Sequence, residues 1–222
     1  MKARVDAAAR AAGRDPAELT IVAVTKTWPV SDVAHLLSLG VLDIGENRAQ
    51  ELATKQLELK GLTAQDPKTP APRWHFIGQL QRNKAALVGR SCTALHTLDR
   101  GELIRPLQRA ASEASHRLDV FLQLSLDGDP HRGGVVEDGI SALADQVAAA
   151  SSLRLAGLMA VPPLGAAPRP AFARLRAASE RIQRSHPGSG AISAGMSGDL
   201  EEAVMEGATH LRVGTGLMGS RP

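Results

Sequence analysis

The sequence contains no tyrosine and few aromatic residues of any kind. Aromatics make up 2% of its 222 residues, whereas hydrophobic residues make up 43%. The hydrophobic fraction is large enough to build a sizeable core. Because aromatic side chains are so scarce, we expect this core to consist mainly of Leu, Val, Ile and Ala. The lack of tyrosine also excludes a phenol as a general acid or base.

Cysteine is nearly absent as well. The single Cys92 cannot form an internal disulfide, which is typical of proteins from a reducing compartment. We interpret Cys92 as a small buried side chain, because a lone cysteine without an identified partner indicates no catalytic site.

We expect neither a targeting segment nor a membrane-spanning segment in this sequence. Residues 1–14 are rich in Ala and Arg but also carry acids, which favours a surface helix over a signal peptide. No apolar run approaches the length of a membrane span. We therefore expect a soluble cytoplasmic protein, with residues 1–18 forming an N-terminal helix and its lead-in.

Positive charge is only slightly in excess, with a formal net charge of +3. Basic residues alternate with acids along helical stretches, as on a solvated helix face. No aromatic residue lies within a basic stripe, so we expect no nucleic-acid binding. A mild positive balance suits a small anionic ligand.

Apolar runs alternate with amphipathic stretches along the whole chain, and we find no internal repeat. The runs that read as strands are Leu19–Lys26, Val41–Gly45, Trp74–Gly78, Ala94–Leu98, Leu118–Leu126, Leu153–Val161, Ala191–Ala194 and His210–Gly214. Eight strands alternating with helices predict a (β/α)8 TIM barrel, an α/β fold. A doubly wound open sheet is the alternative, since strand count does not reveal closure. We expect residues 1–222 to form a single domain.

Two segments read as extended loops. Gly61–Arg73, rich in Pro, Thr and Lys, predicts a mobile surface loop. Asp127–Gly134 follows the fifth strand and is dense in turn residues. Asp127, Asp129 and His131 suggest a metal site, but alternating acids in such a segment are more often part of a turn, and we expect no metal.

Lys26 ends the first apolar run, which has the composition of a strand buried on both faces. A lysine at this place projects its amine into a partly desolvated site at the carboxyl end of the barrel strands. Desolvation lowers the pKa of an amine and makes it a better nucleophile toward a carbonyl. The alternative is a lysine that extends to solvent from a strand end.

Glycine-rich turns follow the seventh and eighth strands, around Ser197 and Thr215. Such turns present backbone N–H groups, which together with a hydroxyl form an anion pocket. Barrels commonly bind phosphate at this corner. The alternative is that the glycines only permit tight turns. Acids at Asp199, Glu201 and Glu202 compete with a bound anion.

A Schiff-base lysine and a phosphate cradle together suggest pyridoxal 5′-phosphate (PLP). Lys26 would meet the aldehyde, and Ser197 and Thr215 would meet the phosphate. Arg212, just before the last glycine-rich turn, is within reach of the pyridine nitrogen. A guanidinium only donates hydrogen bonds, so the ring nitrogen facing it stays unprotonated and the ring is a poor electron sink.

Six motifs together resemble a known family. They are Ala23-Val24-Thr25-Lys26-Thr27, Ile44-Gly45-Glu46-Asn47, Trp74-His75-Phe76-Ile77-Gly78 with Leu80-Gln81-Arg82-Asn83-Lys84, Gly157-Leu158-Met159, Ser193-Ala194-Gly195-Met196-Ser197-Gly198-Asp199, and Arg212-Val213-Gly214-Thr215. In these residues the chain, from Leu19 to Arg221, resembles the pyridoxal-phosphate homeostasis proteins (YggS/PROSC-like), which are similar to the barrel domain of alanine racemase.

The resemblance implies a role for each residue of the site. Lys26 carries PLP as an internal aldimine and Arg212 faces the pyridine nitrogen. The remaining cofactor-binding residues implied are Asn47 and Met196, which line the site, and Ser197, Gly214 and Thr215, which hold the phosphate. His75 is expected to be structural.

The chain departs from the family pattern in three places. The N-terminal helix is shorter, Ala194 replaces a more usual Met, and the stretch from Leu122 to Gly134 diverges. These departures concern the rim of the site. They affect the expectation of substrate or partner contacts more than that of PLP binding.

The expected function is a PLP carrier that buffers or delivers the cofactor without catalysis. Alanine racemases use a tyrosine as second base, which this chain lacks, although His75 or Cys92 could substitute. A weak racemase or related amino-acid enzyme is therefore one alternative, and a cofactor-free Schiff-base aldolase is another. The resemblance also implies transient contact with PLP-dependent apo-enzymes. We expect a monomer, because racemases dimerise through a second domain.

Overall fold

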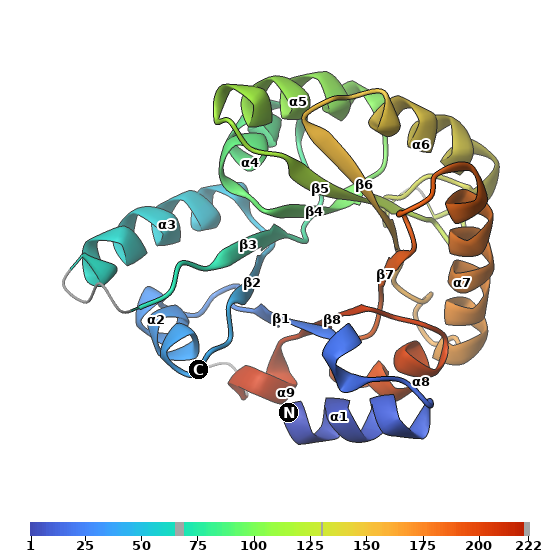
Figure 1. Ribbon diagram of the computed structural model, residues 1–222, viewed down its shortest axis with the longest axis horizontal. Helices are drawn as coiled ribbons and strands as arrows, with labels where there is room; N and C mark the ends of the chain where they lie inside the picture. Colours follow the sequence, from blue (N-terminus) through green and yellow to red (C-terminus); the bar gives the residue numbers. More distant parts are fainter. Residues whose placement is uncertain (65–68, 130, 220–222) are drawn as a thin grey trace.

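The computed structural model describes residues 1–64, 69–129 and 131–219. Within them, eight parallel strands close into a barrel in chain order (Figure 1). The strands are β1 (Thr20–Val24), β2 (Asp43–Glu46), β3 (Arg73–Phe76), β4 (Ala94–Leu98), β5 (Leu118–Gln123), β6 (Leu153–Met159), β7 (Ala191–Ser193) and β8 (His210–Val213). Strands β1 and β8 complete the closure, pairing from Thr20 opposite His210 to Ala23 opposite Val213. The predicted (β/α)8 barrel is confirmed, and the open sheet is excluded.

Helices surround the barrel on its outside (Figure 1). They are α1 (Lys2–Ala11), α2 (Val30–Ser38), α3 (Ala49–Thr63), α4 (Ala85–Ser91), α5 (Ile104–Glu113), α6 (Ile140–Ala148), α7 (Pro168–Ser185), α8 (Leu200–Met205) and α9 (Thr215–Met218), with short 3-10 turns at Pro16–Glu18, Arg82–Lys84, Gly101–Leu103 and Glu137–Gly139. The N-terminal helix α1 packs against α8. The chain therefore returns its last elements to the side of its first.

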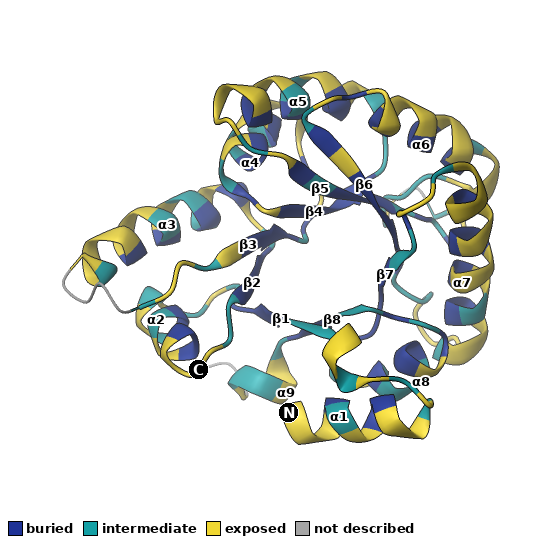
Figure 2. Ribbon diagram, viewed as in Figure 1, coloured by how far each residue is buried: buried dark blue, intermediate teal, exposed yellow. Residues whose placement is uncertain are grey.

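The core lies between the strands and the inner faces of the helices. Figure 2 shows strands that are mostly buried and helices whose outer faces are exposed. Leu, Val, Ile and Ala supply most of the buried apolar side chains. The three phenylalanines, Phe76, Phe121 and Phe172, are also fully buried. The scarce aromatic residues are thus used as packing volume.

The predicted loop at Gly61–Arg73 begins too early. Helix α3 continues through Thr63, whose hydroxyl donates to the carbonyl of Leu59 at 3.0 Å. A glycine inside a helix costs about 1 kcal/mol, which the strong helix formers before Gly61 offset. Residues 65–68 of this segment lie outside the described part of the chain. Every predicted strand is present, most of them shorter at one or both ends than the apolar run.

No helix in residues 1–64, 69–129 and 131–219 combines the length and the apolar character needed to cross a bilayer. Helix α7 shows why: it has 18 residues but carries several arginines.

Candidate functional site

A pocket of about 410 Å³ lies where the strands end in the direction of the chain. It is lined by Val24, Lys26, Asn47, Ile77, Val161, Met196, Ser197, Gly198, Arg212, Gly214 and Thr215. These residues follow or end β1, β2, β3, β6, β7 and β8. All seven residues that the sequence singled out as cofactor contacts are among them. The pairing of β1 with β8 places Lys26, which follows the first strand, in the same pocket lining as Thr215, which follows the last.

The turn that carries Lys26 is fixed on both sides of that residue. The Trp28 N–H donates to the Thr25 carbonyl at 3.0 Å, which closes a tight turn. Thr27 takes a left-handed backbone conformation, with φ of 70°, which costs a non-glycine residue free energy. Its N–H donates to Glu51 Oε1 at 2.6 Å. Lys26 itself is half-buried at the pocket wall.

A buried charged cluster stands behind this turn. Lys55 Nζ donates to the Thr25 carbonyl at 2.7 Å, to Glu46 Oε1 at 2.6 Å and to Glu51 Oε1 at 2.8 Å. Lys55 is 5% exposed and Glu46 is fully buried. Burial raises the pKa of Glu46, although hydrogen bonds from Lys55 and Thr25 oppose this. The cluster ties helix α3 to the backbone on which Lys26 stands.

Sequence reasoning missed Lys55 and Glu51. A Glu followed four residues later by a Lys on a helix is typical of a solvated face. The available signal was Glu46 itself, a carboxylate at the end of a strand expected to be buried in the barrel. A buried carboxylate needs a partner, and α3 supplies it.

Asn47 is held by a close backbone approach. A Cβ atom added to Gly78 would lie 1.9 Å from the Asn47 carbonyl oxygen. Only glycine fits at position 78, because any larger residue would push the loop after β3 away from the end of β2. The glycine of the third-strand motif therefore sets the position of Asn47 in the pocket wall.

The two glycine-rich turns after β7 and β8 contact each other. The Gly216 N–H donates to Ser197 Oγ at 3.0 Å. The backbone N–H groups of Gly198, Gly214 and Thr215 donate to no acceptor within the described residues. Three free donors and the hydroxyls of Ser197 and Thr215 thus lie at one corner of the pocket and suit an anion. We call this part of the pocket the anion corner.

Nearby acids are largely engaged elsewhere. Arg4 of α1 pairs with Glu201 through two hydrogen bonds of 2.6 and 2.7 Å, and its Nη1 donates to the Ser197 carbonyl at 2.8 Å. Asp199 Oδ1 accepts the Met196 N–H at 2.6 Å. Two of the three acids expected to compete with an anion are thus committed to holding the turn after β7.

Arg212 reaches the pocket from the interior of the barrel. It is 6% exposed. Its Nη1 donates to the carbonyl and the hydroxyl of Ser193 at 2.8 and 2.6 Å, and its Nη2 donates to the Ala160 carbonyl at 3.0 Å. Burial lowers the pKa of Arg212 to about 10, which leaves the guanidinium charged at neutral pH.

Comparisons with known proteins match the sequence and the fold of this chain. The model of the alanine racemase N-terminal domain family matches residues 1–222. The pyridoxal phosphate homeostasis protein of Mycobacterium bovis is 41% identical over 232 residues, which cover 100% of this chain and 90% of that protein. The protein of the same name from Pseudomonas aeruginosa is 40% identical over 222 residues, covering 99% of this chain and 92% of that protein. This chain belongs to the pyridoxal phosphate homeostasis protein family. The predicted resemblance is confirmed.

Solved structures agree with this assignment. PipY of Synechococcus elongatus, solved with PLP bound, has a TM-score of 0.83 and 32% identity, covering 99% of this chain and 100% of that one. Alanine racemase of Corynebacterium glutamicum has a TM-score of 0.68 at 15% identity, covering 100% of this chain and 61% of that one. The second likeness shows the fold alone, which confirms the predicted alanine-racemase type of barrel.

The two residues considered as substitutes for a racemase tyrosine lie away from the pocket of this family member. His75 is buried in the barrel interior and bonds to Asp43 and His96. Cys92 is buried just before β4, at the opposite ends of the strands, and burial raises the pKa of its thiol to about 12. Neither side chain lines the pocket.

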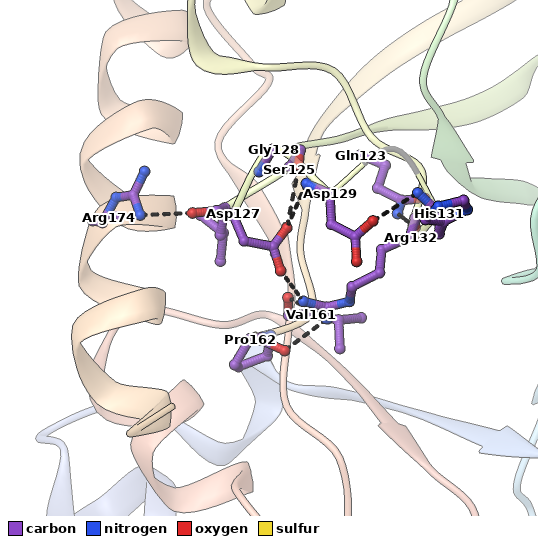
Figure 3. Close-up of polar contacts among 11 residues, drawn as sticks. Gln123, Ser125, Asp127, Gly128, Asp129, His131, Arg132, Val161, Pro162 and Arg174 are labelled. Carbon is purple, nitrogen blue, oxygen red and sulfur yellow. Dashed lines mark hydrogen bonds and ion pairs between the residues drawn. The ribbon is translucent and has the colours of Figure 1, made fainter. Parts of the chain in front are cut away.

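The described residues of the divergent Asp127–Gly134 segment contact the residues that follow β6 (Figure 3). Arg132 pairs with Asp127 and donates to the carbonyls of Val161 and Pro162, the latter at 2.7 Å. Val161 belongs to the pocket wall. Position 130 lies outside the described residues. In the described part of the chain, no group of His, Cys, Asp or Glu is placed to hold a metal ion.

A larger groove of about 840 Å³ lies between α4 and α5. It is lined by Arg82, Asn83, Ala86, Arg90, Arg105, Pro106, Arg109, Ala110 and Glu113. It contains none of the residues that the family motifs singled out as cofactor contacts. The chemistry of the lining, not the size of the hollow, therefore identifies the candidate site.

Proposed function

We propose that this protein binds PLP as an aldimine of Lys26 and acts as an intracellular carrier that buffers or delivers the cofactor without catalysis. One observation carries the proposal: a single pocket combines an amine, an anion corner and a donor-only guanidinium. PipY, which is 32% identical over nearly the whole chain and was solved with PLP bound, supports it.

The residues present fit the chemical groups of PLP. Lys26 supplies the amine for the aldehyde. Ser197, Thr215 and the free N–H groups of Gly198, Gly214 and Thr215 suit a phosphate. Asn47 and Met196 form the sides of the pocket. When bound, PLP supplies an aldehyde and a conjugated ring able to take up electrons.

Arg212 favours storage over catalysis. A guanidinium cannot accept a hydrogen bond, so the pyridine nitrogen beside it is left without a proton. An unprotonated ring withdraws electrons weakly. A cofactor held in this way is retained through its aldehyde and phosphate while its reactivity toward amino acids stays low.

The positions of His75 and Cys92 also support the carrier over the racemase. Both are buried outside the pocket lining, and the sequence has no tyrosine. The measurement that separates the two functions is incubation with L-alanine and other L-amino acids, followed by chiral analysis. Sustained racemisation at ordinary enzyme rates contradicts the carrier.

The aldimine is tested by borohydride reduction followed by peptide mapping with mass spectrometry. We expect a yellow protein whose visible band bleaches, with the label on Lys26. Lys26→Ala abolishes the band, whereas the control Lys60→Ala, on the exposed end of α3, keeps it. A cofactor-free aldolase gives no visible band, and an unchanged spectrum in Lys26→Ala refutes the assignment.

Delivery is tested by mixing the loaded protein with a PLP-dependent apo-enzyme and measuring recovered activity. Recovery faster than spontaneous release of PLP supports direct transfer through a transient complex. We also propose a monomeric cytoplasmic protein, for which light scattering and cell fractionation are the tests.

A further inference from the structure

A chain of buried polar side chains crosses the interior of the barrel beneath the pocket. Five strands contribute one member each: Asp43 of β2, His75 of β3, His96 of β4, Ser193 of β7 and Arg212 of β8. All five are buried, with exposed fractions of 8% or less. Only Arg212 reaches the pocket.

Each member lies within hydrogen-bond distance of the next. Arg212 Nη1 is 2.6 Å from Ser193 Oγ, and Ser193 Oγ is 2.7 Å from His96 Nδ1. His96 Nε2 is 2.9 Å from His75 Nδ1, and His75 Nε2 is 2.9 Å from Asp43 Oδ1. The hydrogen-bond chain therefore contains four hydrogen bonds, which we call its links.

The two ends determine the direction of the protons. A guanidinium only donates, and a carboxylate only accepts. Burial would raise the pKa of Asp43, but hydrogen bonds from His75 and Arg73 lower it to about 2, so Asp43 is ionised. His75 must then donate from Nε2, His96 from Nε2, and Ser193 from its hydroxyl.

The neutral chain has the right number of protons. Arg212, Ser193, His96 and His75 each contribute one proton to one of the four links. An additional proton on either imidazole would place two N–H or O–H groups in the same link. Burial lowers the pKa of His96 well below its usual value, and Phe121 stacks on its ring with the centroids 4.5 Å apart.

We propose that Ser193, His96 and His75 are positioning residues, which hold the Arg212 guanidinium in the pocket through a one-way hydrogen-bond chain that ends on Asp43. The part of this inference that concerns PLP rests on the proposed function. Arg212 is long and flexible, and its other acceptors are main-chain carbonyls of Ser193 and Ala160. The hydrogen-bond chain adds one side-chain acceptor, the Ser193 hydroxyl. Because this hydroxyl donates its proton to His96 Nδ1, a lone pair of its oxygen faces Arg212.

The proton arrangement is tested without any ligand. Long-range proton–nitrogen NMR on the ¹⁵N-labelled full chain reports the tautomer of each imidazole, with His75→Gln and His96→Gln used for assignment. At neutral pH we expect His75 and His96 to be neutral and protonated at Nε2. A proton on His96 Nδ1, or a charged His96, would contradict the proposed direction of the hydrogen-bond chain.

The positioning role is tested with Ser193→Ala, with Ser179→Ala of α7 as the control for loss of a buried serine hydroxyl. Losing one hydrogen bond to a charged group corresponds to about a tenfold change in binding. We expect PLP to leave Ser193→Ala about tenfold faster during dialysis, with the visible band still present at the start. Retention equal to that of the control overturns the role.

The two arms separate failure of this inference from failure of the proposed function. If the wild-type protein takes up no PLP, the proposed function fails, and the NMR measurement still decides the proton chain. If PLP binds through Lys26 but the tautomers of His75 and His96 differ from those stated, only the proposed hydrogen-bond chain is wrong.

Discussion

Ion pairs support both sides of the candidate pocket, but they differ in burial. Behind the Lys26 turn, the Lys55 and Glu46 side chains are 6% and 0% exposed. Beside the turn after β7, the Arg4 and Glu201 side chains are 41% and 46% exposed. Both pairs have a shortest N–O distance of 2.6 Å.

The difference in burial changes what each pair does. Removing one partner of a buried pair leaves an uncompensated charge and costs several kcal/mol, whereas exposed pairs contribute little to stability. The buried pair behind Lys26 therefore contributes to the stability of the whole barrel. The anion corner is held by contacts that affect the position of a loop more than the stability of the protein.

The largest effect is expected for Lys55→Met. It leaves the buried Glu46 carboxylate without its cation, and we expect a loss of about 3–5 kcal/mol of unfolding free energy, measured by urea denaturation. Lys60→Met, on an exposed position of the same helix, is the matched control and should change stability little. Equal stability of the two variants would contradict the role of the cluster.

A smaller, pH-dependent effect is expected for Asp43→Asn. The folded pKa of about 2 is below the ordinary 3.8, so the carboxylate stabilises the fold above pH 3.8 and loses this contribution as the pH falls through 2. The shift corresponds to about 2 kcal/mol. In urea denaturation the unfolding free energy of the wild type should exceed that of Asp43→Asn at pH 7. The difference between the two should close toward pH 2. A gap that is constant with pH would contradict this.

Arg4→Ala should separate stability from cofactor retention. We expect less than about 1 kcal/mol of lost stability, because the pair is exposed. PLP should leave several-fold faster, because Arg4 also holds the Ser197 carbonyl. The control is Arg10→Ala, also exposed on α1. High salt should accelerate release from the wild type more than from Arg4→Ala, and the absence of this difference would count against the contact.

The smallest effect is expected for Arg132→Ala. Its hydrogen bonds to the carbonyls of Val161 and Pro162 connect the 127–134 segment to one wall of the pocket. We expect about a twofold faster release of PLP, since both hydrogen bonds are only half-buried. Stopped-flow release into excess apo-enzyme is the measurement, and release at the rate of the wild type would exclude the segment from the retention of PLP.

The sequence predicted what depends on order along the chain. Eight apolar runs indicated the barrel, and residues just after those runs, such as Lys26 and Thr215, could be assigned to one end of it. It did not predict contacts across the barrel. The Glu51 and Lys55 pair has the spacing of a solvated helix face, and no sequence pattern connects Ser193 of the seventh-strand motif with His96, which lies 97 residues earlier in the chain.

Barrel closure has a consequence for biosynthesis. The pocket needs Lys26 after the first strand and Thr215 after the last, and these meet only when β8 joins β1. A chain still emerging from the ribosome holds the amine but has no partner turn for it. The complete pocket therefore forms only after translation has passed the final strand.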